Sequence, residues 1–238
     1  EVNLGVKEVL KLPRETIEER FGLEGNQGLA SEFVGACTKG VHGGAFLYTN
    51  IDTLSLGLIV NLESVVGHES KALDLIEEFK NHIAVKRLIK GAESIEYSAH
   101  LIPVAGLDGS PKLYSNGMLV SGDAAGFVVA TGLVLEGMNY AVASGIAAAN
   151  AVKWAKDQGD FSEKTLSRYE KELESSYVLP DMRNYRKAAN FMRNPRMYTS
   201  YPEFVCSLGE KVLFSGNGPK KKVWRLMKDE VMGRLSIW

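Results

Sequence analysis

Cysteine is scarce in this 238-residue sequence, where Cys37 and Cys206 are the only two. Two distant thiols cannot supply a four-thiolate metal site or an iron–sulfur cluster, and they offer no disulfide framework. The sequence also has no excess of basic residues, because it contains 28 Lys and Arg and 29 Asp and Glu. A nucleic-acid binder usually shows such an excess, so that class is not favoured. The longest weakly polar run, 117–137, contains Asp123 and Glu136, so it lacks the ~20 apolar residues of a membrane helix.

Motifs for several familiar chemistries are missing as well. The sequence has no nucleophile elbow, no H-E-x-x-H and no P-loop, and its four histidines lack cysteine or carboxylate partners at metal spacing. It also has no G-x-G-x-x-G dinucleotide fingerprint, since Gly216-Asn217-Gly218 has no third glycine. Catalysis by acid–base or nucleophilic side chains is therefore weakly supported. A bound cofactor is the better explanation for any chemistry.

Glycine, in contrast, is abundant: its 24 residues make up about a tenth of the chain, against a usual share of ~7%. The strongest chemical signal is Gly122-Asp123-Ala124-Ala125-Gly126, which follows the predicted short strand 117–121. Such a turn lets a ligand approach the backbone, places a carboxylate acceptor beside it and turns amides toward an anion. A plain tight turn with Asp123 as a helix cap is the alternative. Gly132 and Gly137-Met138, at the start of an alanine-rich helix, favour ligand binding.

Two further positions are candidates for contact with a flat substrate. The Gly43-Gly44 pair after His42 is predicted to form a turn between two strands, where paired glycines expose backbone amides and carbonyls. An ordinary glycine hairpin turn is the favoured alternative at this point. His100, in a predicted strand, could face a redox centre, although a lone strand histidine is more often a half-buried structural residue.

The pattern of apolar residues predicts an α+β protein. Strands are expected at 2–12, 29–36, 45–50, 54–62 and 95–103, forming a mainly antiparallel sheet. Helices are expected at 14–21, 70–81 with Ser70 as N-cap, 85–89, 136–156, 162–177, 180–192, 201–214 and 222–232. The lysine run 220–222 is interpreted as a solvated helix start. The chain starts without Met inside a predicted strand, which suggests a piece of a longer protein.

Taken in order, several segments resemble the FixC family, FAD-dependent relatives of electron-transfer-flavoprotein:quinone oxidoreductase. The resemblance covers nearly the whole chain but only the C-terminal portion of such a protein. It is carried by residues 5–9, 43–50, 54–57, 96–100 and 122–126, by Gly137-Met138-Asn139, by 194–197 and by Tyr201-Pro202.

The resemblance implies a fold, a cofactor and partners. The expected parts are a substrate-domain sheet with inserted helices (1–112), the second half of a split FAD-binding domain similar to p-hydroxybenzoate hydroxylase (113–158), and a helical C-terminal region (159–238). FAD would contact residues 122–126, Gly137 and Met138, with Asp123 on the ribityl chain, and a quinone would meet Gly43, Gly44 and His100.

The implied function is electron transfer between an electron-transfer flavoprotein or a ferredoxin-like protein and a quinone. The expected location is cytoplasmic, with peripheral contact at the inner face of the membrane. The fragment alone is expected to be inactive. Two alternatives remain open: a geranylgeranyl reductase-like flavoprotein that saturates isoprenoid lipids, and a non-catalytic docking fragment.

Overall fold

Alternating apolar side chains build a five-stranded antiparallel sheet in the computed structural model, which describes residues 2–104, 106–131, 134–214 and 218–234. The strand order is β2-β3-β4-β1-β5. In the register, Val6 lies opposite Leu58 on one side and Ala99 on the other. The strands are β1 (Val2–Lys11), β2 (Ala30–Phe33), β3 (Gly43–Thr49), β4 (Thr53–Asn61) and β5 (Glu93–Pro103).

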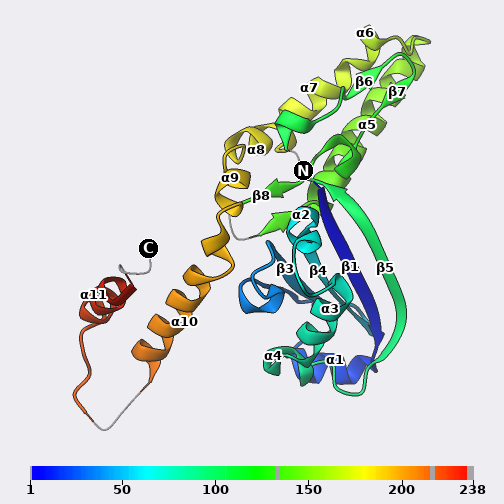
Figure 1. Cartoon of the computed structure of the whole chain (residues 1–238). Coiled ribbons are helices and arrows are strands. Elements are labelled where there is room, and N and C mark those ends of the chain that lie inside the picture. Colours follow the sequence, from blue (N-terminus) through cyan, green and yellow to red (C-terminus); the bar gives the residue numbers. More distant parts are fainter. Residues whose placement is uncertain (1, 105, 132–133, 215–217, 235–238) are drawn as a thin grey trace.

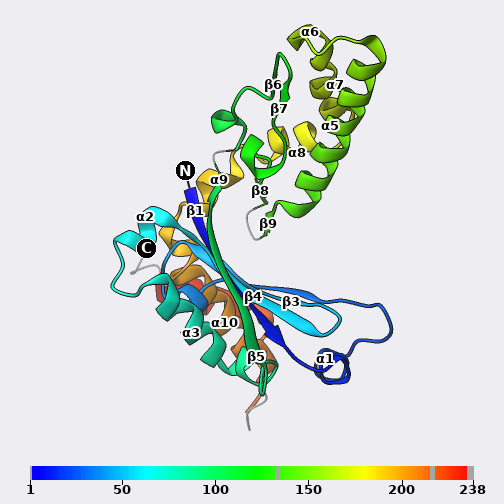
Figure 2. The same cartoon turned by 90° about the vertical axis from the view of Figure 1, so that its right-hand side faces the viewer.

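Helices cover one face of this sheet, as Figures 1 and 2 show. Buried β4 residues Leu54, Leu56 and Leu58 pack with Leu75 and Phe79 in one core, which burial of apolar surface stabilises. The opposite face carries Phe46, Tyr48 and Ile59, which are only partly buried. The covering elements are α1 (Arg14–Phe21), η1 (Ala36–Thr38), α2 (Leu62–Val66), α3 (Ala72–Asn81) and α4 (Ile83–Lys86).

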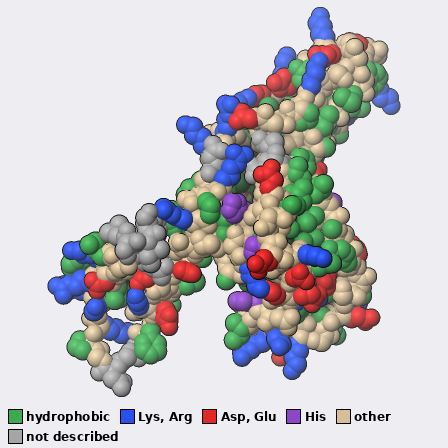
Figure 3. All heavy atoms as spheres, viewed as in Figure 1, with side chains coloured by type: hydrophobic (Ala, Val, Ile, Leu, Met, Phe, Trp, Pro, Cys, Tyr) green, Lys and Arg blue, Asp and Glu red, His purple; other side chains and the backbone are tan. Residues whose placement is uncertain are grey.

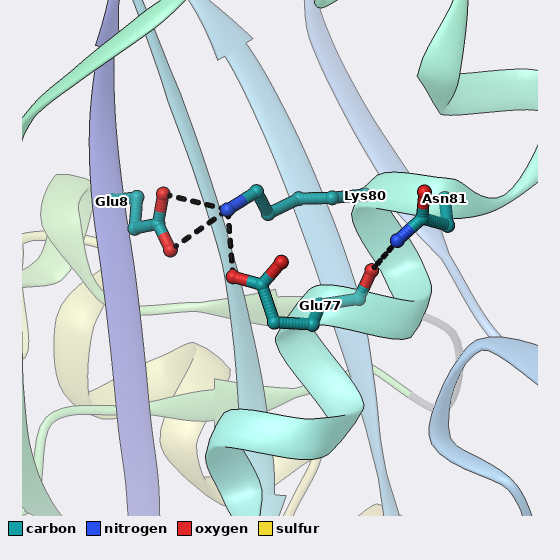
Figure 4. A network of polar contacts seen from close by, with 4 residues as sticks. All are labelled: Glu8, Glu77, Lys80 and Asn81. Atoms are coloured by element: carbon teal, nitrogen blue, oxygen red, sulfur yellow. Dashed lines mark hydrogen bonds and ion pairs between the residues drawn. The ribbon is translucent and has the colours of Figure 1, made fainter.

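A charged pair lies inside this helix–sheet layer. Glu8 occupies a core position of β1, and the Nζ of Lys80 on α3 donates to both its carboxylate oxygens at 3.2 Å (Figure 4). Lys80 also donates to Glu77 Oε1 at 2.7 Å, and Asn81 Nδ2 donates to the Glu77 backbone carbonyl at 2.8 Å. Burying a carboxylate without a partner costs free energy, so this network stabilises Glu8 at its buried position in β1.

A second core lies in the upper part of Figure 1 and packs around a long helix. Buried Ala147 and Ala151 of that helix let Tyr169 approach closely, and the Tyr169 hydroxyl donates to the Val120 carbonyl at 2.9 Å. The elements are η2 (Leu107–Gly109), β6 (Tyr114–Ser115), β7 (Met118–Leu119), η3 (Gly122–Ala125), β8 (Val129–Ala130), β9 (Leu135–Glu136), α5 (Met138–Gln158), α6 (Glu163–Leu166), α7 (Arg168–Ser175) and α8 (Val178–Asn184).

The chain then passes back along the sheet and ends in an arm that stands away from the body (Figure 1). None of the described helices is long and apolar enough to cross a membrane. Among the described residues, no group of three or more His, Cys, Asp or Glu is placed to hold a metal ion. The last elements are α9 (Ala188–Met192), η4 (Pro195–Met197), α10 (Ser200–Leu213) and α11 (Val223–Arg234).

The two cysteines are both free thiols in different surroundings. Cys37 is half-buried behind β2, and burial raises the pKa of its thiol to about 11. Cys206 is exposed on α10.

The predicted α+β class with an antiparallel sheet and a helical C-terminal region is confirmed. Several local expectations are wrong. The helix expected at 162–177 breaks at Ser167 into α6 and α7, and the one expected at 180–192 breaks into α8 and α9. The N-cap of α3 is Lys71 rather than Ser70. The division at 112 and 158 stays a prediction, and residues from both later parts share the second core.

Candidate functional site

A pocket of about 130 Å³ opens between the uncovered side of the sheet and the chain segments that cross it. Its volume is close to the ~150 Å³ cavities that admit a benzene-sized molecule. The sheet supplies one wall from β1, β2, β3 and β4, whereas the β8–β9 hairpin, the end of α9 and the segment after it supply the other. Residues that line it include Gly43, Gly44, Phe46, Ile59, Leu135 and Tyr198.

The glycine pair lines this pocket from inside a strand. Gly43 and Gly44 begin β3 and pair with Val60 and Ile59 of β4, so the turn predicted there is wrong. A Cβ at Gly43 would lie 2.2 Å from the Ile59 carbonyl oxygen, and one at Gly44 would lie 2.9 Å from the Phe33 carbonyl oxygen. Close strand packing therefore requires both glycines, and only their backbone can face a ligand.

An aromatic stack closes one side of the pocket. The ring of His42 stacks on the buried ring of Tyr198 with centroids 5.1 Å apart. The Tyr198 hydroxyl donates to the Met192 carbonyl at 2.9 Å, and the His42 amide donates to Ser64 Oγ at 3.1 Å. Figure 3 shows histidine side chains near the middle of the molecule, where its upper and lower parts meet. The stack joins the C-terminal segment to the start of β3, and the two hydrogen bonds hold each ring's residue in its own segment.

Two titratable side chains from neighbouring strands line the same pocket. Burial raises the pKa of Glu32 on β2 above its ordinary value, and the Glu136 carboxylate raises it further. Burial also raises the pKa of Tyr48 on β3, with a further contribution from Glu32. The Tyr48 ring stacks on Phe46 at 4.9 Å. The pocket thus combines aromatic surface with one acid that holds its proton to a higher pH than usual.

The Gly-Asp turn lies in a short 3₁₀ helix, η3, and not at the start of a long helix. Gly122 and Gly126 have φ of 65° and 77°, which favour glycine. The Gly122 amide donates to the buried Ser144 Oγ of α5 at 3.0 Å, so this hydrogen bond is used inside the protein and not for a ligand. Asp123 and Ala124 are exposed, whereas Ala125 is buried.

The β8–β9 hairpin joins this turn to the pocket. Leu135 of β9 lines the pocket, and two residues later Gly137 caps α5, where Met138 has 74% of its surface exposed. Asn139 Nδ2 donates to Glu136 Oε2 at 2.7 Å in the same turn. The β8–β9 hairpin therefore lines the same pocket as Gly43 and Gly44 and leads directly into the start of α5. Gly132, predicted to take part, lies outside the described residues, as do Gly216 and Asn217.

His100 is not brought to the pocket. It lies on β5 opposite Gly5 of β1 and is exposed. Strands β1 and β4 separate β5 from β3 and its glycine pair.

Sequence reasoning missed Glu32, Tyr48, His42 and Tyr198 as pocket residues. Only the alternation of β2 and β3 could have indicated that Glu32 and Tyr48 face the uncovered side of the sheet. The pairing of His42 with Tyr198 joins distant segments, and no local pattern marks it.

Comparison with known proteins identifies relatives of this α+β chain, whose pocket lies beside the uncovered face of the sheet. FixC of Escherichia coli K12 is 43% identical over 229 residues, which is 94% of this chain and 53% of FixC. FixC of Salmonella typhi is 41% identical over 245 residues, covering 98% of this chain and 57% of that protein. A probable electron transfer flavoprotein-quinone oxidoreductase of E. coli, YdiS, is 40% identical over 94% of this chain and 52% of YdiS.

The predicted resemblance to the FixC family is confirmed, and the chain spans about half the length of these curated relatives. No protein-family model matches the chain. Among solved structures, a flavoprotein/dehydrogenase from Cytophaga hutchinsonii aligns with the whole chain and 50% of its own, at 14% identity and a TM-score of 0.47. The flavin-dependent brominase Bmp2 aligns with a TM-score of 0.46 and 16% identity.

Proposed function

We propose that this chain is part of a FAD-dependent oxidoreductase that passes electrons between an electron-transfer flavoprotein or ferredoxin-like partner and a quinone. The proposal rests on the sequence similarity to FixC and YdiS. The observation that carries it is the ring-sized pocket, which is joined through the β8–β9 hairpin to the Gly-Asp turn and the start of α5.

The residues around η3 and α5 fit half of a flavin site. Asp123 presents an exposed carboxylate, an acceptor for ligand hydroxyls, and the neighbouring Ala124 leaves room for close approach. The start of α5, with Gly137 and Met138, directs helix amides outward, where they favour negative charge. In this proposal Ala125 and Gly126 shape the turn, while Gly122 orients it through its bond to Ser144.

The pocket fits the head group of a quinone. Its volume suits one six-membered ring, and Phe46, Ile59 and Leu135 give it an apolar lining. Gly43 and Gly44 contribute backbone without side chains. His100 lies two strands away, so the proposed quinone contacts are those of the glycine pair.

When bound, the flavin would supply two-electron redox chemistry. This chain would bind and orient the two reactants and exclude water from the pocket. Reduction of a quinone to a quinol also takes up protons. Glu32 lies at the pocket and has a raised pKa, so its carboxyl group can hold a proton there nearer to neutral pH.

A chimaera would test the proposal. This chain would replace the matching 229 residues of E. coli FixC, and flavin would be measured by visible absorbance after desalting. We expect a flavin-containing protein, loss of the flavin bands in Asp123→Ala, and retention in Asp157→Ala, an exposed carboxylate at the other end of α5. Flavin content unchanged in Asp123→Ala would remove Asp123 from the site. Reoxidation of the reduced chimaera by a soluble short-chain quinone would then test the acceptor.

A further inference from the structure

Strand β3 presents an uneven row of residues to the pocket. Successive side chains of a strand point to opposite faces, so Gly44, Phe46 and Tyr48 share one face of the sheet. The alternate residues Ala45 and Leu47 are buried in the helix-covered core, whereas the other three line the pocket. The row at the pocket therefore begins with a residue that has no side chain and continues with two aromatic rings.

Phe46 and Tyr48 show that rings two positions apart on this strand stack on each other. Their centroids lie 4.9 Å apart, and their planes are inclined by 25°. Tyr48 therefore covers one face of the Phe46 ring. Because the three residues follow one another along β3, the other face of that ring is turned toward the space above Gly44.

Gly57 of β4 determines where the Phe46 ring lies. It is opposite Phe46 in the register and is buried. A Cβ at Gly57 would lie 2.5 Å from Cζ and 2.9 Å from Cε1 of Phe46, so the ring reaches across to β4 and rests over the glycine backbone. With Gly57 beneath it and Tyr48 beside it, the ring is held in one orientation and keeps one face at the pocket.

A second aromatic pair lies on the other side of Gly44. His42, two residues before Gly44, stacks on Tyr198, and both residues line the pocket. A strand rises by ~3.4 Å per residue, so His42 and Phe46 are separated by ~14 Å along the chain. Aromatic rings stack at centroid separations of ~4.5–7 Å, so this spacing leaves room for one planar ring between the two pairs.

We propose that Phe46 is the stacking platform for the planar ring of the ligand, which takes the place above Gly44 that a side chain would otherwise fill. The ligand ring extends the Tyr48–Phe46 stack by one member. This inference rests on the proposed function, which makes the ligand a quinone, and it names the residue that selects a planar ring. An isoprenoid chain has no ring to stack on Phe46, so the platform favours a quinone over a prenyl lipid.

An acidic side chain adjoins the platform. Glu32 of β2 lies opposite Phe46 in the register and lines the same pocket. Burial and the Glu136 carboxylate raise the pKa of Glu32, so it keeps its proton to a higher pH than usual. A protonated carboxyl group can donate a hydrogen bond to an oxygen at the edge of the stacked ring. The ligand class that fits is a planar ring with an oxygen substituent.

Ligand binding to the flavin-free 238-residue chain tests the platform by nuclear magnetic resonance. The probes are duroquinone, a fully methylated quinone that does not add to thiols, and para-cresol, a ring of similar size that is not a quinone. We expect both to bind, with their methyl proton resonances shifted upfield because they lie over the face of the Phe46 ring. Probes that bind without an upfield shift would overturn the proposal, and this measurement requires no substitution.

Matched variants locate the platform. Phe46→Leu keeps an apolar side chain but removes the ring, so it should weaken the binding of both probes by about three- to tenfold and abolish the upfield shift. The control Tyr97→Leu also replaces a ring by leucine, on β5 at a position 48% exposed, and should change the affinity less than about twofold. Equal losses in the two variants would overturn the assignment to Phe46. Far-ultraviolet circular dichroism would establish that both variants fold.

The two probes separate this inference from the proposed function. If para-cresol binds with an upfield shift and duroquinone does not bind, the platform is supported and the quinone is removed from the proposed function. If duroquinone binds Phe46→Leu as tightly as the unaltered chain, the quinone is retained and the platform is overturned. Binding of neither probe would overturn the platform.

Discussion

Tyr198 holds the C-terminal segment to the sheet by stacking on His42, at an interplanar angle of 19°. The ring of Tyr198 is buried, and its hydroxyl also binds the Met192 carbonyl. One residue thus organises both the end of α9 and a wall of the pocket.

Replacing Tyr198 should loosen that wall. Tyr198→Ala removes a buried ring and should lower the free energy of unfolding by about 3–5 kcal/mol, whereas Tyr198→Phe keeps the stack and should cost about 1 kcal/mol. The measurement is urea denaturation followed by circular dichroism. Tyr185→Ala, at a position 42% exposed, is the control and should have a small effect. Equal losses at both positions would contradict a structural role for the stack.

The Glu8–Lys80 pair gives a second prediction. Lys80→Met leaves the Glu8 carboxylate buried without its ammonium partner, so the free energy of unfolding should fall by about 3–5 kcal/mol. Glu8→Leu/Lys80→Met removes both charges and should recover most of the loss. Chemical denaturation of the two variants and the wild type at pH 7 measures the difference. A double variant no more stable than Lys80→Met would contradict this account.

Tyr169 should make stability depend on pH in the alkaline range. Burial raises the pKa of its hydroxyl to about 12, against about 10 in an unfolded chain. The folded state therefore binds this proton more tightly, and the stabilisation is complete below about pH 10 and lost as pH rises toward 12. Tyr169→Phe should be about 1 kcal/mol less stable at pH 8 and lose less stability between pH 10 and 12. Denaturation midpoints across that range provide the test, and parallel curves would contradict it.

Gly43 should tolerate no side chain. In Gly43→Ala the new methyl group would collide with the Ile59 carbonyl, so β3 must move away from β4. The resulting loss of strand pairing should destabilise the protein by several kcal/mol. Thermal unfolding of Gly43→Ala beside Gly28→Ala, where a Cβ would have its nearest neighbour at an ordinary 3.7 Å, makes the comparison. Similar midpoints for the two variants would contradict the predicted clash.

Gly145 should behave in the opposite way. It lies inside α5, where a Cβ would meet nothing within 4 Å, so Gly145→Ala should stabilise this chain by about 0.5–1 kcal/mol through helix propensity. Thermal unfolding of the 238-residue chain measures this. A destabilised variant would show that this side of α5 is already closely packed.

The long elements of the fold were predictable because their periodicity is local. Strand β1 and helices α1 and α5 occur within two residues of the expected bounds. The ten-residue strand β1 and the alanine-rich run of α5 are long enough to carry a clear local signal, and Pro13 marks the start of α1. Strands β8 and β9 contain two residues each, too few for any period. The break between α6 and α7 also escaped prediction, because the buried residues Leu166, Tyr169 and Leu173 keep helical spacing across it.

The candidate site could be predicted only in part, for a physical reason. The Gly-Asp turn and the glycine pair are visible as sequence because each is contiguous. Gly43 lies in a strand because β3 pairs with β4, where the Ile59 carbonyl leaves no room for a side chain. This pairing is a tertiary contact that the local sequence does not show. His42 and Tyr198 are far apart in the sequence and meet only through the tertiary fold.

The unequal surroundings of the two thiols have a practical consequence. At pH 7.5 the half-buried Cys37, with a pKa of about 11, is almost entirely the unreactive thiol. Exposed Cys206 on α10 should then be the position that a maleimide modifies first. The sequence therefore offers a selective labelling site on α10, where an environment-sensitive dye could be attached without any engineered cysteine.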